Sequence, residues 1–92
     1  MLLPMRCYVG VVHKEADSSF GVSFPDLPGC ATVGRTMANA RQMAAEALAT
    51  HLAGFATNDS LPVARSLSQI RDDPEWEDAT TLILVEAPAK SN

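Results

Sequence analysis

Acidic side chains are the residues of this 92-residue chain that could support metal-dependent chemistry. Metal-assisted cleavage of a phosphodiester needs several carboxylates that converge on divalent ions. The chain offers Glu15, Asp17, Asp26, Glu46 and an acidic group at 72–78. None of them lies in the first or third expected strand, where a converging cluster would be held in place. We therefore predict that the acidic group is a solvated surface, and that the chain has no catalytic residue and no metal site.

The other reactive side chains are isolated along the sequence. Cys7 and Cys30 form no C-x-x-C pair, and no cysteine or carboxylate is spaced to bind a metal together with His13 or His51. The serines lack the context of a catalytic nucleophile, and the glycines lack the spacing of a phosphate-binding loop. We predict two reduced, half-buried thiols, a half-buried His51 that packs against its neighbours, and no cofactor.

The charge balance favours a protein partner over a nucleic acid. Seven Lys and Arg residues stand against eleven Asp and Glu residues, which gives a net charge of −4. The basic residues are scattered and form no stripe that could displace counterions from phosphates, whereas an acidic surface speeds the encounter with a basic protein. Residues 1–4 are too few for a signal peptide, and the apolar run Leu82–Val85 is too short to span a membrane. We expect a soluble, cytoplasmic protein.

Three strands are expected in the first part of the chain. A strand is predicted at 6–13, which is rich in β-branched and aromatic residues, and a second at 20–24, where apolar residues alternate. The polar link between them is short, so we predict an antiparallel hairpin. Two prolines and Gly29 force a sharp turn after the second strand. A short third strand is predicted at 30–34.

A long amphipathic helix is predicted after Thr36, which is a suitable N-cap. Its alanines allow close approach to a sheet, and Gly54 and the polar residues 57–60 end it. The apolar residues of the helix recur at spacings of three and four: Met37, Ala40, Met43, Ala44, Ala47, Leu48, His51, Leu52 and Phe55.

The last third of the chain returns to the sheet. An extended crossing is predicted at 61–64, followed by helical turns at 66–70 and 73–76, with a proline at the first helical position of the second turn. The final strand, 80–86, is apolar enough to lie in the centre of a sheet. Its place near the terminus also allows an edge position, where an apolar strand is usually paired or covered.

The expected fold class is α+β, with the element order β-β-β-α-β. A three-stranded antiparallel meander and a C-terminal strand form the sheet, and one long helix packs on it. We expect one domain over 1–92, with an N-terminal extension at 1–5 and a tail or linker at 88–92. A domain of this size has a thin core, and self-association often supplements it.

The segment Gly21–Gly34, GVSFPDLPGCATVG, resembles the hallmark of the HicB antitoxin family. In that family a hairpin is followed by a G-x-x-F-P-D-x-P-G-C-x-T-x-G turn and strand. The similarity continues through the alanine-rich helix to the last strand and covers residues 6–87. The resemblance implies a truncated RNase H-like fold. It also implies a protein that binds HicA, a small basic toxin that cleaves messenger RNA.

Members of the HicB family commonly carry a C-terminal ribbon-helix-helix or helix-turn-helix segment that binds operator DNA. This sequence stops at 88–92, where such a segment would begin, so we expect DNA binding only through a segment that is not present here. Inhibition is expected to be steric, with acidic hairpin and turn residues covering the RNA-binding face of the toxin. The expected partner contacts are Glu15, Asp17, Phe24, Asp26 and Leu27.

Several alternatives stay open at this point. Asp26 could accept backbone amides inside its own turn, as Asx turns do, instead of facing a partner. The chain could also be a stand-alone oligomeric adaptor of the same fold without a toxin, or a residual RNase H-like nuclease. For the antitoxin, we expect a homodimer or a higher homo-oligomer and no membrane association.

Overall fold

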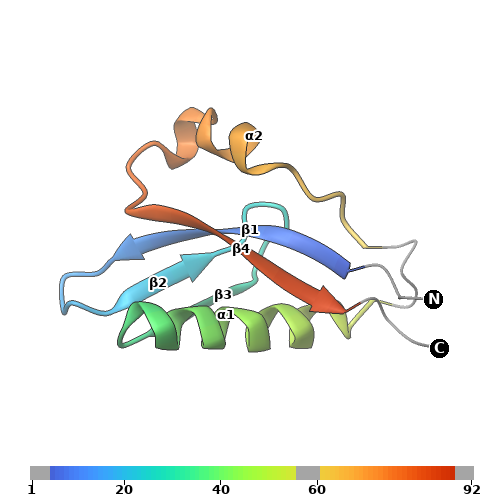
Figure 1. The fold of residues 1–92 in the computed structure, drawn as a ribbon, viewed down its shortest axis with the longest axis horizontal. Coiled ribbons are helices and arrows are strands. Elements are labelled where there is room, and N and C mark those ends of the chain that lie inside the picture. The colour runs from blue at the N-terminus through green and yellow to red at the C-terminus, as the bar shows by residue number, and fades with distance from the viewer. Residues whose placement is uncertain (1–4, 56–60, 89–92) are drawn as a thin grey trace.

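The structure, a computed structural model, describes residues 5–55 and 61–88 (Figure 1). The predicted strands and the predicted long helix are present with bounds that differ by a few residues, which confirms the α+β fold class. In chain order the elements are β1 (Met5–Lys14), β2 (Phe20–Ser23), β3 (Ala31–Gly34), α1 (Met37–Leu52), α2 (Leu67–Arg71), the 3-10 helix η2 (Pro74–Trp76) and β4 (Thr81–Pro88).

The strands form one antiparallel sheet in the order β3-β2-β1-β4. β1 pairs with β2 over its second half. On its other side it pairs with β4 over nearly its whole length, from Met5 opposite Pro88 to Val12 opposite Thr81. β4 therefore lies at an edge of the sheet, one of the two positions that its sequence left open.

Helix α1 covers one face of the sheet (Figure 1). Because side chains alternate along a strand, every second residue of β1 and β4 points toward this helix. The buried residues of α1 are Ala40, Ala44, Leu48 and Leu52, and the small alanines allow a close approach to the sheet. The main core is made of the buried residues Tyr8, Val12, Val22, Phe24, Leu27, Cys30, Ala40, Ala44, Leu48, Leu52, Leu61, Ile83 and Val85.

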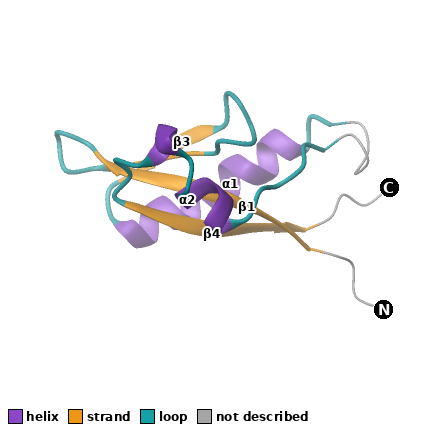
Figure 2. Ribbon diagram, turned by 90° about the horizontal axis from the view of Figure 1, so that it is seen from above, coloured by secondary structure: helices purple, strands orange, loops and turns teal. Residues whose placement is uncertain are grey.

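Helices α2 and η2 cover the opposite face of the sheet, as both views show (Figures 1 and 2). Here Val9 and Val11 of β1 pack with Ile70 of α2, and Leu82 and Trp76 adjoin this second cluster. A layer on each face explains why both β1 and β4 lack a regular polar alternation. It also explains why β4 is apolar on both faces although it lies at an edge, since such a pattern is more usual for a central strand.

Local capping sets where the helices begin. The Thr36 hydroxyl accepts from the Asn39 amide at 3.0 Å, which confirms the predicted N-cap. Ser66 and Gln69 form a reciprocal capping box at the start of α2, and Pro74 begins η2 as predicted. Helix α1 ends at Leu52, slightly earlier than predicted.

Some predictions fall on parts of the chain that are not described. β1 begins at Met5 and β4 continues to Pro88, while residues 1–4 and 89–92 of the predicted extension and tail lie outside the described ranges. The same is true of 57–60, which were predicted to end the helix. None of the helices in 5–55 and 61–88 has the length and apolar character that crossing a membrane requires.

Candidate functional site

The loop between β1 and β2 holds Glu15 and Asp17, two of the predicted contact residues. The Ser18 amide donates to the Glu15 carbonyl at 3.0 Å, and the Glu15 amide donates to the Ser19 carbonyl at 2.8 Å. Ser18 has a φ of 71°, a left-handed conformation that is uncommon outside glycine. Asp17 stabilises this turn, because its Oδ1 accepts from the Ser19 hydroxyl at 2.6 Å and from the Ser19 amide at 3.1 Å.

The hydrogen bonds within the loop also fix its charge. The bond from the Ser19 hydroxyl and then the bond from the Ser19 amide lower the pKa of Asp17 below its ordinary value. Glu15 and Asp17 are both exposed. The loop therefore presents two carboxylates to solvent, and the orientation of one of them is set by its own turn.

A groove follows β3 and α1 next to this loop. Its first part, about 320 Å³, is lined by Asp17, Val33 and Arg35 among others. Its second part, about 310 Å³, is lined by the 29–32 turn and by α1 residues that include Glu46. Met43 lines both parts, so they adjoin, and we refer to them together as the β3–α1 groove.

The proline-rich turn between β2 and β3 contains the other three predicted contact residues. The turn is closed by backbone bonds: the Leu27 amide donates to the Phe24 carbonyl at 3.0 Å, and the Cys30 amide donates to the Leu27 carbonyl at 2.9 Å. Gly29 has a φ of 87°, a positive value that glycine adopts without a steric cost. Phe24 and Leu27 are both buried in the main core. Their side chains hold the turn on the sheet and are not offered to a partner in this conformation.

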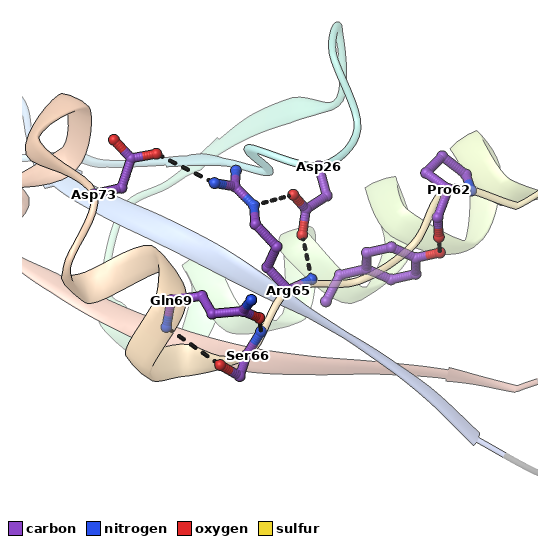
Figure 3. Close-up of polar contacts among 7 residues, drawn as sticks. Asp26, Pro62, Arg65, Ser66, Gln69 and Asp73 are labelled. Carbon is purple, nitrogen blue, oxygen red and sulfur yellow. Dashed lines mark hydrogen bonds and ion pairs between the residues drawn. The ribbon is translucent and has the colours of Figure 1, made fainter.

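Asp26 links this turn to the crossing segment before α2 (Figure 3). Its Oδ2 accepts from the Arg65 backbone amide, and its Oδ1 accepts from Arg65 Nε, both at 2.7 Å. Arg65 Nη1 also donates to Asp73 Oδ2 at 3.2 Å. The hydrogen bond to Asp26, assisted by Asp73, raises the pKa of the Arg65 guanidinium. We call Asp26, Arg65 and Asp73 the Arg65 clamp.

The Arg65 clamp corrects the expectation for Asp26. The carboxylate does accept a backbone amide, but the amide is that of Arg65, 39 positions away, and not one in its own turn. Arg65 is not among the contact residues predicted from the sequence. A weak signal is the isolated arginine that precedes the S-x-x-Q capping box, but nothing in one sequence pairs it with Asp26. Nearby, the Tyr8 hydroxyl donates to the Pro62 carbonyl at 2.6 Å and holds the same crossing segment on the core.

The acidic group at 72–78 lies on α2, η2 and the loops beside them. Asp73 caps η2, where its Oδ1 accepts from the Glu75 amide at 3.0 Å, and Asp78 Oδ1 lies 3.7 Å from His13 Nε2. Asp72, Glu75 and Glu77 are exposed, which confirms the prediction of a solvated acidic surface. Within the described ranges, no three His, Cys, Asp or Glu residues gather so that they could hold a metal ion.

The thiols and His51 have packing roles. Cys7 and Cys30 are free, and Cys7 is half-buried as predicted, whereas Cys30 is fully buried. The Cys30 thiol donates to the Ala47 carbonyl at 3.7 Å, and burial raises the pKa of this thiol. His51 is half-buried, and its ring centre lies 5.9 Å from that of Phe55, which confirms its predicted role.

Comparison with known proteins gives a family match over nearly the whole chain. Residues 8–90 match the model of the HicB-like antitoxin of bacterial toxin–antitoxin systems. The chain is also 33% identical over 66 residues to an uncharacterized 14.9 kDa protein from the rep–hol intergenic region of Haemophilus phage HP1. That alignment covers 71% of this chain and 50% of the phage protein, so the chain spans half the length of this relative.

Solved structures with a similar fold come from the same group of proteins. The N-terminal domain of the Burkholderia pseudomallei antitoxin HicB superposes with a TM-score of 0.73 at 24% identity, covering 89% of this chain and 98% of the domain. The B. pseudomallei antitoxin HicB superposes with a TM-score of 0.73 at 25% identity, and the superposition covers 89% of this chain and 63% of that chain. A chain of the HicA3–HicB3 toxin–antitoxin complex superposes with a TM-score of 0.71 at 28% identity, and the superposition covers 87% of this chain and 95% of that chain.

Proposed function

Because the chain belongs to the HicB-like antitoxin family of bacterial toxin–antitoxin systems, we propose that it serves as an antitoxin that binds and inhibits a HicA-type toxin. The family match over residues 8–90 is the observation that carries this proposal. The likeness to a chain from a complex of HicA3 with HicB3 supports the choice of partner.

Inhibition in this proposal is steric and depends on charge. The resemblance to HicB proteins implies a small basic ribonuclease as the partner, while this chain has a net charge of −4. Opposite charges speed the encounter of two proteins and fix their relative orientation. By covering the RNA-binding face of the toxin, the chain prevents cleavage without any catalytic group of its own, so we propose that it is not an enzyme.

We place the contact surface on the β1–β2 loop and the adjoining β3–α1 groove. Glu15 and Asp17 are exposed there, and Asp17 is held by its bonds to Ser19. Phe24 and Leu27 are buried and Asp26 belongs to the Arg65 clamp, so these three support the neighbouring turn. Their part in toxin binding is therefore indirect.

Co-expression with the product of the adjacent reading frame tests the function. We expect the two proteins to purify as a complex, and we expect addition of this chain to stop RNA cleavage by the partner. Uninhibited cleavage in the presence of the folded chain would contradict the antitoxin role. Metal-dependent RNA cleavage by this chain alone would instead support the residual nuclease.

A pair of charge variants tests the surface. Glu15→Lys combined with Asp17→Asn replaces the negative charge of the loop with a positive one, and the asparagine keeps an oxygen that can accept from Ser19. Glu75→Lys combined with Glu77→Gln makes the same change of charge on the exposed surface of η2. We expect only the first variant to associate with the toxin more slowly than the parent. The difference in association rate should become smaller at high salt, because salt already screens the attraction between the parent and the toxin. Weaker binding by the second variant alone would move the contact to η2.

Three further properties belong to the same proposal. The antitoxin acts in the cytoplasm, it self-associates, and residues 1–92 do not hold operator DNA by themselves. The last property follows from the acidic net charge and from the scattered basic residues, which leave little counterion release to drive phosphate binding.

A further inference from the structure

The sheet has two edge strands, and they differ in length and surroundings. β3 spans four residues and β4 spans eight. No strand of the described chain lies outside either of them. An edge strand presents unpaired amides and carbonyls, and natural proteins usually shorten such an edge, interrupt it or cover it. β3 is already short, so β4 is the edge strand at which pairing with another strand is expected.

β4 lacks most of the features that protect an edge. Its register with β1 continues without a bulge from Thr81 to Pro88, so the strand is regular over its length. Between Thr81 and Glu86 the glutamate is the only charged residue, and Pro88 comes at the end of the strand. Leu84, near the middle, is 51% exposed. A regular, apolar edge of this kind is suited to pairing with another strand.

The hollow beside β4 contains equal numbers of positively and negatively charged side chains. The hollow, of about 390 Å³, lies between this strand and α1. Its lining contains one cation, Arg41, one anion, Glu86, and the small residue Ala45. Two copies of a chain of net charge −4 repel each other in general, but they do not meet like charges in excess at this edge. The β3–α1 groove, in contrast, carries both Asp17 and Glu46 against Arg35, which suits a basic partner better than a second acidic chain.

We infer that β4 pairs antiparallel with β4 of a second copy, about a two-fold axis near Leu84. Such an interface is self-complementary, as two-fold symmetry requires. The two sheets then form one continuous sheet with both α1 helices on the same face, and Leu84 meets its counterpart across the axis. The β3 edge stays free at the far side of each sheet. The β1–β2 loop follows Lys14 at the end of the sheet where β4 begins, so neither of them is part of the strand that pairs. The inference rests on the self-association in the proposed function and not on toxin binding.

Three lysine variants of the 92-residue chain test this interface. Leu84→Lys places two like charges next to each other at the axis. Val33→Lys makes the same change on the β3 edge, where the valine is 53% exposed, and Val63→Lys makes it on the crossing segment, where the valine is 87% exposed. All three sites are exposed, so we expect each variant to keep the parent's circular dichroism spectrum and melting curve. Light scattering at tens of micromolar should then find a dimer for the parent, Val33→Lys and Val63→Lys, and a monomer for Leu84→Lys.

A crosslinking experiment gives a second readout that does not depend on disrupting the interface. In a Cys7→Ser background, Leu84→Cys should form a disulfide-linked dimer on mild oxidation, because residues opposite each other at the axis are close enough to bridge. Val33→Cys in the same background should not. A dimer that survives Leu84→Lys and is lost in Val33→Lys would overturn the choice of edge and leave self-association standing. A monomeric parent would overturn both, while the toxin-inhibition assay would still decide the antitoxin role.

Discussion

Asp26 and Arg65 show how a short polar contact can hold distant parts of a small fold together. The Asp26 carboxylate is largely buried, with 10% of its side chain exposed, while Arg65 is 36% exposed. Hydrogen bonds to charged groups contribute more to stability than bonds between neutral groups. The two bonds at 2.7 Å therefore fix the turn after β2 to the crossing segment before α2.

We predict that Asp26→Ala lowers the free energy of unfolding by about 2–3 kcal/mol, because it removes both bonds and leaves the Arg65 amide without this acceptor. Urea unfolding measures the loss. Asp72→Ala, which removes an exposed carboxylate close by, should change stability by less than about 0.5 kcal/mol. Additive effects of Asp26→Ala and Arg65→Ala in a double-mutant cycle would mean that the pair is not coupled.

The two cysteines should differ in reactivity. The thiolate is the reactive form, and burial raises the pKa of the Cys30 thiol, so little thiolate is present at neutral pH. We predict that a thiol reagent labels half-buried Cys7 first, and that Cys30 reacts only at alkaline pH or after unfolding. Mass spectrometry of Cys7→Ser and Cys30→Ser at several pH values separates the two rates. Equal rates at neutral pH in the folded protein would contradict the burial of Cys30.

The corner between β3 and α1 depends on one glycine. A Cβ at Gly34 would lie 2.5 Å from Ala40 Cα, and these are backbone atoms of α1 that have no room to move away. We predict that Gly34→Ala lowers the free energy of unfolding by about 1–3 kcal/mol or more, the usual range for overpacking. The melting temperature should fall accordingly. At Gly54 a Cβ would come no closer than 3.4 Å to the His51 carbonyl. Gly54→Ala should therefore be mild, and equal losses in the two variants would argue against the close approach at the corner.

Elements with strong local signals could be predicted from the sequence. The spacing of the apolar residues in α1, the Thr36 cap, and the alternation in β2 are local, and each appears in the structure close to its predicted position. The sequence left β4 open between a central and an edge position, because the apolar character of Leu82, which comes from contact with the cluster around α2, is compatible with both. The partner of Asp26 was missed for a similar reason, since 39 positions separate it from Arg65. Burial of Phe24 and Leu27 likewise depends on how the turn folds back on the core.

At the scale of the whole molecule, charge predicts how the chain meets nucleic acid. With a net charge of −4, residues 1–92 should not retain operator DNA in a gel-shift titration, even at about 50 mM salt, where phosphate contacts are strongest. The expected result is the same for operator and unrelated DNA. Sequence-specific retention that falls as salt rises would contradict the prediction and would place a DNA-reading surface within this domain.

The position of β1 has a consequence for biosynthesis. β1 is the first strand of the sheet to be made, yet one of its two neighbours, β4, is the last. As the chain leaves the ribosome, β2, β3 and α1 can assemble around β1 while its other side stays unpaired and the α1 layer lacks Ile83 and Val85. Contacts between such distant residues form slowly, and open apolar edges attract chaperones and proteases. The sheet of the nascent chain is therefore incomplete, with one side of β1 unpaired, until residues 81–88 have left the ribosome.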